Sequence, residues 1–517
     1  IVCSGCLCAN LPFALPQLRC SACEQLIKNN AHYYADKDVS RRVKLCNGCF
    51  SDLEAGGSLP NLDLEGTHAE EFEKTTWRAT EEEDYDHFVQ CEGDCRRWYH
   101  YVCARFPDLS QLTSWRDRGL EQESFICDTC RSELPPYSPV LQSCARLLRL
   151  QTRKAKELPR CHLSASVEVF MATVLKAGGV QAKDVVVRVV SDKEFSFPVM
   201  AAMKERYGDQ YPDEFPYNSK VLLAFQTIRG RDVCFFAMYV QEYGPTCPPP
   251  NTNRTYISYL DSVPYLMTEP AGQRTPVYHA IINGYLRHAC TQGFEHAHIW
   301  VAPPQSGDEY IFHARPPHPR HQNKAMSMSK LRAWYEQLLQ HGRENQIVLG
   351  TTDIHAAVEH LTSVRDFPLF YGDFFPEEMA RILAAQGSSQ ASHSKPADSR
   401  GGADSRGADN RGPPPMVRES SKAVVQKMQR RAREVRRRFL VAKLNTGLGD
   451  LAGIEADEDP TPRPKRDEAG SQQSNPLIDA RLHFLQSCIT RHWQFDELRR
   501  AHYTTMMILA EIGGQPA

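Results

Sequence analysis

The residues best suited to chemistry are short pairs of cysteines near the start of the chain. Twelve of the 18 cysteines lie before position 131, most of them with two residues between neighbours. Zinc takes four soft ligands in a tetrahedron, and this spacing lets one turn of backbone hold the ion, whereas a disulfide framework is typical of small secreted domains. The pattern predicts about three zinc ions, reduced thiols and an intracellular compartment. The six ligand pairs are Cys3/Cys6, Cys20/Cys23, Cys46/Cys49, Cys91/Cys95, His100/Cys103 and Cys127/Cys130.

The bulk properties of the chain limit the other classes of function. Its 517 residues suffice for several domains, and 41% hydrophobic with 24% charged residues is ordinary for globular protein. The net charge of −2 predicts no polyanion partner from overall charge. No apolar run reaches the roughly 18 residues of a membrane span. The chain begins at Ile1 rather than methionine, which suggests a fragment, so a missing signal peptide carries little weight.

Hydrophobic periodicity predicts how the region after the cysteines is built. Strands mixed with helices, and a hairpin signal at Arg229-Gly230-Arg231, indicate an α/β domain around a mainly antiparallel or mixed sheet. The expected strands are Asp184–Val190, Lys220–Ile228, Asp232–Tyr239, Thr255–Leu260 and His298–Val301. The expected helices are Leu163–Ala177, Pro276–Ala289, Ser329–Gln340, Glu419–Leu444, Ile478–Ile489 and Phe495–Ile512.

These elements alone do not name a reaction. Tyrosine and tryptophan in strands and helices are usually core residues, and neither a G-x-G-x-x-G fingerprint nor a Walker A loop is present. The basic stretch Arg430–Arg438 could touch DNA, although a solvated basic helix face is the commoner interpretation. The reaction is therefore inferred from a resemblance.

Several ordered motifs resemble the catalytic core of the CBP-type lysine acetyltransferases, the family of the CREB-binding protein and its plant relatives. The resemblance runs from about 168 to 376 and resumes at 479–509. It implies an enzyme that transfers acetyl from acetyl-CoA to histone lysines in the nucleus, with histone tails and transcription factors or coactivator complexes as partners and no membrane. The motifs are Tyr243–Asn251, Tyr256–Ser262, Arg274-Thr275, His298-Ile299-Trp300, Tyr310–His313, Leu331–Tyr335, Tyr371–Phe374 and Leu498–Ala501.

The same resemblance implies roles for single residues. Tyr335 would be the general acid that protonates the leaving thiolate, Trp300 would orient the acceptor lysine, Trp334 would lie beside the thioester, and Asp479 would belong to the substrate groove. The family's arginine before the Trp-Tyr pair is Lys330 here, and two of its acidic groove positions fall on Tyr371 and Leu482. The implied cofactor-binding residues are Leu260, Asp261, Ser262, Arg274, Thr275, Tyr278, Trp300, Lys330 and Trp334.

The cysteine region from Cys46 to Cys130 resembles a PHD finger, in which the first and third ligand pairs share one ion and the second and fourth share another. Cys3/Cys6 with Cys20/Cys23 would then form a one-zinc RING-like unit. In this family the RING and PHD parts are intertwined, so the sharing among the first three pairs stays open. Trp98 before His100 resembles PHD fingers that bind methylated lysine through cation–π contact; the alternative is packing in the small zinc core.

The expected domains follow from these assignments. They are an intertwined RING-like unit at 1–50, a PHD finger at 46–135, an acetyltransferase core at 150–386, a disordered loop at 387–418 and the closing part of the same domain at 419–517. The loop stands where the family carries a lysine-rich autoinhibitory loop, but only Lys395 and Lys422 lie in or near it, which favours a passive linker. The competing class is a non-catalytic zinc-finger chromatin scaffold; a ubiquitin ligase would need a full two-zinc RING, for which there are too few ligands.

Overall fold

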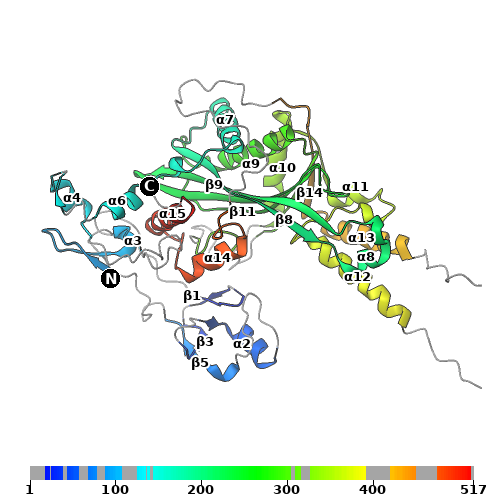
Figure 1. Ribbon diagram of the computed structural model, residues 1–517, viewed down its shortest axis with the longest axis horizontal. Coiled ribbons are helices and arrows are strands. Elements are labelled where there is room, and N and C mark those ends of the chain that lie inside the picture. Colours follow the sequence, from blue (N-terminus) through cyan, green and yellow to red (C-terminus); the bar gives the residue numbers. More distant parts are fainter. Residues whose placement is uncertain are drawn as a thin grey trace, which may run out of the picture.

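A seven-stranded mixed sheet is the centre of the computed structural model (Figure 1). The structure describes residues 18–23, 25–28, 30–38, 43–56, 68–78, 88–107, 125–135, 137–139, 144–303, 309–315, 327–391, 420–449 and 474–513. The strand order is β13-β14-β12-β11-β10-β9-β8, and only the β11/β12 pair is parallel. The predicted α/β fold with a mixed sheet is therefore confirmed. The strands are β8 (Val185–Pro198), β9 (Glu214–Ile228), β10 (Arg231–Tyr243), β11 (Arg254–Ser262), β12 (His296–Trp300), β13 (Val348–Asp353) and β14 (Phe439–Leu444).

Helices cover both faces of this sheet. Figure 1 shows α7, α9 and α10 on one face, α14 and α15 on the other, and α8, α11, α12 and α13 gathered at one end. The helices are α7 (His162–Ala177), α8 (Ala201–Tyr207), α9 (Arg274–Thr291), α10 (Met328–Glu344), α11 (Ile354–Val358), α12 (Phe374–Ala391), α13 (Ser420–Val435), α14 (Arg481–Thr490) and α15 (Leu498–Ile512), with short 3-10 turns at Ala155–Glu157, Gly208–Gln210 and Val364–Asp366.

Turn chemistry explains the predicted hairpin between β9 and β10. Arg229 and Gly230 both have positive φ, 51° and 79°, which is the conformation of a type I′ turn and matches the twist of the flanking strands. The register continues from Arg231↔Ile228 to Glu242↔Asn218. The two strands are thus longer than the apolar runs predicted.

Two predictions are corrected at the end of the sheet. The expected helix Glu419–Leu444 stops at Val435, and Phe439–Leu444 is instead strand β14, which pairs with β12 and β13. Five of its six residues are buried and only Lys443 is exposed, so its sequence is an almost continuous apolar run that periodicity cannot distinguish from a helix. Helix α12 continues to Ala391, into the start of the expected disordered loop; positions 392–419 lie outside the described residues.

The cysteine region forms smaller elements beside the sheet domain. One unit contains a three-stranded sheet ordered β4-β3-β5 and helix α2; the other contains the β6/β7 hairpin with α3 and α4. The elements are β1 (Leu18–Arg19), β2 (Leu26–Ile27), β3 (His32–Asp36), β4 (Lys44–Leu45), α2 (Asn47–Glu54), a 3-10 turn (Ala69–Glu71), β5 (Phe72–Thr76), β6 (Phe88–Gln90), β7 (Trp98–His100), α3 (Tyr101–Ala104), α4 (Asp128–Glu133) and α6 (Ala145–Thr152). Among the described helices, none is long and apolar enough to cross a membrane.

Candidate functional site

Helix α10 carries the predicted general acid. The Ser327 hydroxyl caps the helix by accepting a hydrogen bond from the Lys330 N–H (3.4 Å). The ring of Tyr335 is buried, and its hydroxyl has no hydrogen bond to any described residue. Burial raises the pKa of this phenol well above its usual value. Tyr335 therefore keeps its proton at neutral pH and has it available for a ligand.

Trp334 lies against Tyr335 with its ring at 88° and 5.0 Å between centroids. On its other side it meets His279 of α9, 4.5 Å away. Burial lowers the pKa of His279 to about 4, so this imidazole is neutral, and its Nδ1 lies 3.1 Å from Nδ1 of His341. Sequence analysis missed His279, because nothing in the local pattern shows that α9 packs on α10 here.

The amino-terminal end of α9 presents Arg274 and Thr275. The guanidinium of Arg274 is half-buried and makes no hydrogen bond or ion pair with described residues. The helix N-terminus has no side-chain cap, so its backbone N–H groups are also available. Free N–H groups, the helix dipole and a guanidinium together suit a phosphate group. Lys330, at the start of α10, is exposed and likewise unpaired within the described part of the chain.

Tyr278 lies one turn into α9 and connects this end to the sheet. Its ring stacks on Phe236 of β10 with 5.7 Å between centroids. Burial raises the pKa of the Tyr278 phenol, and the nearby Ser262 and Arg274 partly offset this. Leu260 packs against the same apolar core. The predicted residues Leu260, Ser262, Arg274 and Tyr278 are therefore near neighbours at the edge of one core.

Asp261, the remaining member of that predicted set, has every carboxylate oxygen engaged by the chain itself. Oδ2 accepts from the backbone N–H groups of Ile311 (2.9 Å) and Phe312 (3.0 Å), and Oδ1 accepts from Arg315 (2.9 Å) and the Ser262 N–H (2.9 Å). Asp261 is 4% exposed. This geometry indicates that Asp261 acts by holding the 309–315 segment rather than by direct contact with a ligand.

The same segment is fixed from its other end by Glu309. This buried carboxylate contacts His313 Nδ1 (2.9 Å) and accepts from the Ala314 N–H (2.5 Å). It also pairs with Arg19 of β1, 3.1 Å away. The pKa of Glu309 is lowered because His313, Arg19 and the Ala314 N–H outweigh the effect of burial. A residue of the cysteine region thus reaches a loop next to the predicted cofactor strand.

Trp300 ends strand β12 and belongs to a second apolar core. Its ring stacks on Phe374 at 5.8 Å and meets Phe439 at 72° and 5.6 Å. Val301, the next residue, donates to the Arg438 carbonyl (2.7 Å), which ties Trp300 to the start of β14. Phe374 and Phe439 come from segments far from Trp300 in the chain, and only the structure brings them to it.

Tyr310 and Arg481 connect the Trp300 side with the Tyr335 side. The Tyr310 hydroxyl donates to the Ala302 carbonyl (3.3 Å), two residues past Trp300. The pKa of Tyr335 is raised mainly by burial, and the Tyr310 phenol adds to this effect. Arg481 of α14 donates to the Tyr310 carbonyl (2.7 Å) and lies 4.2 Å from the centre of the Tyr259 ring. Sequence analysis did not single out Arg481.

Asp479, predicted for the substrate groove, is buried and fully bonded. It accepts from the Ser191 hydroxyl (2.7 Å), the Ser474 hydroxyl (2.7 Å), the Asn475 N–H (2.8 Å) and Lys193 (3.3 Å). Burial opposes ionisation, but these hydrogen bonds hold its pKa below the usual value. Its hydrogen bonds connect β8 with the segment before α14. Its role toward a substrate stays a prediction.

Two groups of four thiols fit zinc. Cys20, Cys23, Cys46 and Cys49 form one group, and Cys91, Cys95, Cys127 and Cys130 form the other; the sulfur atoms of each group lie within 4.8 Å of one another. The Cys23–Cys46 and Cys95–Cys127 sulfurs are 3.6 and 3.7 Å apart. Four thiolates about 2.3 Å from one zinc ion would have nearly this spacing. These residues would hold the metal and fix the fold around it.

This arrangement decides the pairing that the sequence left open. Cys91/Cys95 lie with Cys127/Cys130, as predicted, and Cys46/Cys49 lie with Cys20/Cys23 rather than with His100/Cys103, among the residues that the structure describes. The Ser21 N–H donates to the Lys44 carbonyl (2.7 Å), which brings Cys46 beside Cys20, whose sulfur accepts from the Cys46 N–H (3.2 Å). His100 Nδ1 and Cys103 Sγ lie 3.6 Å apart; Cys3 and Cys6 lie outside the described residues.

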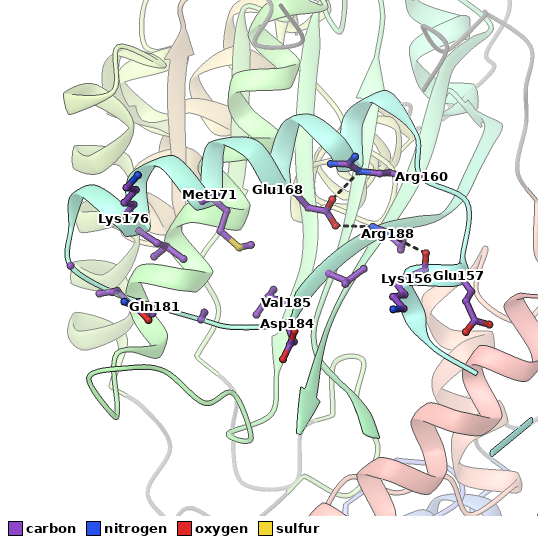
Figure 2. Close-up of a pocket in the computed structure, with 16 residues that line it drawn as sticks. Lys156, Glu157, Arg160, Glu168, Met171, Lys176, Gln181, Asp184, Val185 and Arg188 are labelled. Carbon is purple, nitrogen blue, oxygen red and sulfur yellow. Dashed lines mark hydrogen bonds and ion pairs between the residues drawn. The ribbon is translucent and has the colours of Figure 1, made fainter. Parts of the chain in front are cut away.

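A separate cavity lies between α7 and the start of β8 (Figure 2). It has a volume of about 1080 Å³ and is lined by α7, the start of β8 and the 156–160 segment, and it contains none of the predicted site residues. Arg160, Glu168 and Arg188 form an ion-pair triad at one end. Glu168 also accepts from the Val187 N–H (2.9 Å). This contact satisfies an outward N–H of edge strand β8, which protects the sheet edge from pairing with another chain.

Comparison with known proteins places this geometry in a family. The sequence matches the histone acetyltransferase domain KAT3 over residues 171–447, more than half of the chain. The chain belongs to the KAT3 histone acetyltransferase family. The KAT3 match contains Arg274, Trp300 and Tyr335, and it spans the sheet from β8 to β14.

Individual KAT3-type relatives extend this similarity. The chain is 34% identical to Protein cbp-1 of Caenorhabditis elegans over 347 residues, which is 65% of the chain and 16% of the relative. It is 32% identical to Histone acetyltransferase HAC12 of Arabidopsis thaliana over 419 residues, 74% of the chain and 23% of the relative. It is 27% identical to the rice Probable histone acetyltransferase HAC-like 3 over 98% of the chain and 43% of the relative. The chain thus spans less than half the length of each of these curated relatives.

Proposed function

We propose that this chain is an acetyl-CoA-dependent histone lysine acetyltransferase that acts on chromatin in the nucleus as a transcriptional coactivator. The KAT3 match across the segments that carry Arg274, Trp300 and Tyr335 is the observation that carries the proposal. The cbp-1 and HAC relatives support histones as substrates and coactivator complexes as partners. A non-catalytic scaffold is the weaker interpretation, because the hydroxyl of the buried, protonated Tyr335 has no hydrogen bond to a described residue that would account for it.

The proposed chemistry assigns a step to each part of the site. Acetyl-CoA supplies an acetyl thioester when bound. Arg274, Lys330 and the N-terminus of α9 hold its phosphates. The acceptor lysine has an ordinary pKa of about 10.4, so its ammonium first loses a proton. Its nitrogen then bonds to the acetyl carbon, the carbon–sulfur bond breaks, and the Tyr335 hydroxyl gives its proton to the departing sulfur. The second proton shed by the nitrogen returns through solvent to the phenolate.

Transfer of labelled acetyl from acetyl-CoA to core histones tests this proposal. Replacing Tyr335 with Phe removes one hydroxyl and keeps the ring, so turnover should fall by about 100-fold or more with unchanged acetyl-CoA affinity, as expected for loss of a general acid. Arg274→Ala should weaken acetyl-CoA binding instead, by about tenfold, because a charge-assisted phosphate contact is lost.

Two matched variants serve as controls for these measurements. Tyr137→Phe removes a hydroxyl from an exposed tyrosine, and Arg287→Ala removes a half-buried arginine of α9 that donates to the Gly449 carbonyl (3.0 Å), about 20 Å along the helix from Arg274. Neither should change transfer or affinity. If Tyr335→Phe turns over as fast as wild type, Tyr335 is not the proton donor. If the wild-type protein neither binds acetyl-CoA nor acetylates histones, the chain is not this enzyme.

A second candidate function is recognition of methylated lysine by the cysteine region. Trp98 is 55% exposed at the end of the β6/β7 hairpin, where it pairs with Gln90. An exposed indole face can attract a quaternary ammonium, and this exposure favours the reader over the alternative of a packed tryptophan. Binding of methylated and unmethylated histone peptides to wild type and Trp98→Ala tests it: equal affinity for both peptides would exclude a reader.

A further inference from the structure

A buried carboxyl group, Asp373, lies at the start of α12 next to the aromatic residues that surround Trp300. It directly precedes Phe374, whose ring stacks on Trp300 with an interplanar angle of 21°. Asp373 is 5% exposed, and neither of its carboxyl oxygens has a hydrogen bond of normal geometry to a described residue. Burying an unpaired carboxylate is costly, so this residue needs a role beyond packing.

The surroundings of Asp373 favour an uncharged carboxyl. The nearest polar groups are the Tyr256 hydroxyl and the N–H groups of Phe374 and Phe375. Phe370, whose carbonyl accepts from the Asp373 N–H (3.2 Å), stacks on Tyr256 with 5.1 Å between centroids. Burial raises the pKa of the Asp373 carboxyl to about 7, although these three groups act in the opposite direction.

The other titratable groups near Asp373 do not supply a counter-charge. Tyr243 of β10 is a buried phenol whose pKa is raised by burial. His298 of β12 packs on Phe370, and burial lowers its pKa well below the usual value, so it is neutral. Arg431 of α13 lies over the Phe374 ring at 5.7 Å but pairs with Glu378 (2.7 Å). An ionised Asp373 would therefore be without a cationic partner in the described part of the chain.

We propose that Asp373 is a positioning residue of the acetyl-transfer site, which works in its protonated form and holds Tyr256 and the first turn of α12 so that Phe374 supports Trp300. The inference rests on the proposed function, because the role of Trp300 in orienting the acceptor lysine is part of that function. A protonated carboxyl is both donor and acceptor. Its O–H can donate to the Tyr256 hydroxyl oxygen, while its carbonyl oxygen accepts from the first-turn N–H groups, which have no partner within the helix.

Ionisation would remove the donor and place a bare charge among aromatic rings. Hydration of that charge requires loosening the first turn of α12, which carries Phe374. Binding of the acceptor lysine should therefore weaken as pH rises through the pKa of the Asp373 carboxyl. The affinity for acetyl-CoA should not change, because neither Arg274 on α9 nor Lys330 on α10 makes a hydrogen bond or ion pair with Asp373 or Tyr256 within the described part of the chain.

Acetyl transfer to a histone peptide by Asp373→Asn and Asp373→Ala, from about pH 6 to about pH 9, tests the proposal. The ratio of variant to wild-type kcat/KM cancels the titration of the acceptor lysine. Asn is uncharged and keeps a donor and an acceptor, so its ratio should be near one at low pH and rise severalfold across about pH 7. Asp373→Ala should raise the KM of the peptide about tenfold at low pH, and by less above the pKa of the carboxyl, where wild type is itself weakened, while acetyl-CoA affinity stays unchanged.

Either of two results would overturn the proposal. A ratio for Asp373→Asn that does not change with pH would mean that protonation of Asp373 has no effect on the site. An Asn variant that is inactive at low pH would mean that the site needs the charge of Asp373. Tyr256→Phe keeps the ring and removes the partner hydroxyl, so it should raise the peptide KM even if Asp373→Ala fails to fold. Thermal unfolding supplies a readout independent of activity. The Tm of wild type relative to Asp373→Asn should fall as pH rises from about 4 to about 7, since the folded state favours the protonated acid. If wild type transfers no acetyl yet shows this shift, the proposed function fails and the buried acid stands.

Discussion

The two thiol clusters and the sheet domain stabilise their parts of the chain in different ways. Around Cys20, Cys23, Cys46 and Cys49 the apolar core is small, with Phe50, Phe72 and Trp77 as its large buried side chains. The sheet domain instead has an extended core along β9, β10 and α15 and a second apolar core beneath α12 and α13. Segments as short as the cysteine units cannot bury enough apolar surface to fold without a staple.

This difference determines what each region depends on. The cysteine units depend on four thiols and a metal ion, so their structure should disappear when the metal does. The sheet domain depends on many apolar contacts, so loss of one side chain lowers its stability by a limited amount. The residues proposed for catalysis belong to the second kind of region and should keep their structure when the metal is lost.

The largest expected effect is that of removing zinc. A strong chelator should release about two ions from the described clusters and unfold both cysteine units, because a structural zinc ion contributes on the order of 10 kcal/mol. Metal analysis and limited proteolysis measure this; β9 and β10 should stay protected. The matched variants are Cys20→Ser, which should lose one ion, and Cys234→Ser, which removes a buried thiol of the sheet domain and should lose none. Simultaneous loss of the sheet domain would break the distinction between the regions.

A core substitution should have a smaller effect and in the other region only. Phe225 of β9 is 1% exposed, and Phe225→Ala should destabilise the sheet domain by about 3–5 kcal/mol. Its Tm should fall by about 10 °C, as calorimetry can measure. Phe50→Ala, the matched change beside the first thiol cluster, should keep its zinc, because the four thiols rather than the ring hold that unit. Loss of zinc from Phe50→Ala would show that apolar packing, not the metal, is decisive there.

The smallest expected effect concerns the cofactor side. Lys330→Arg gives the exposed start of α10 a guanidinium that can contact a phosphate with two hydrogen bonds instead of one point charge. Acetyl-CoA affinity, measured by calorimetry, should rise about fivefold with unchanged turnover. Lys176→Arg on α7 is the matched exposed control and should change neither. A weaker affinity in Lys330→Arg would mean that Lys330 does not face a phosphate.

Much of the sheet domain could be predicted because its signals are local. The helix predicted at Leu163–Ala177 and the hairpin at Arg229–Arg231 were found within one or two residues, since periodicity and turn chemistry depend only on near neighbours. Strand β14 was predicted as a helix because its almost continuous apolar run has no clear alternation. Its place between β12 and β13 depends on pairing across more than 80 residues.

The candidate site divides in the same way. Tyr335, Trp300 and Arg274 could be named from motifs. The guanidinium of Arg274 has no hydrogen bond or ion pair with a described residue, which agrees with a ligand-binding role. Asp261 and Asp479 were also named, yet each has its carboxylate filled by backbone N–H groups and side chains from other segments. His279, Arg481 and Asp373 could not be singled out, because an isolated histidine, arginine or aspartate becomes informative only when its neighbours are known.

The sequence by itself determined the ligand chemistry, the α/β composition and the family motifs, since residue types and short spacings are set by covalent connection. The tertiary structure alone decided which thiol pairs lie close enough to share a metal, because the hydrogen bonds between Ser21 and Lys44 bring Cys46 to Cys20. It also decided that Asp373 is buried beside Phe374, whose ring stacks on Trp300, with no cationic partner in the described part of the chain. Burial and long-range contact set the charge of a side chain, and both arise only when distant segments close on one another.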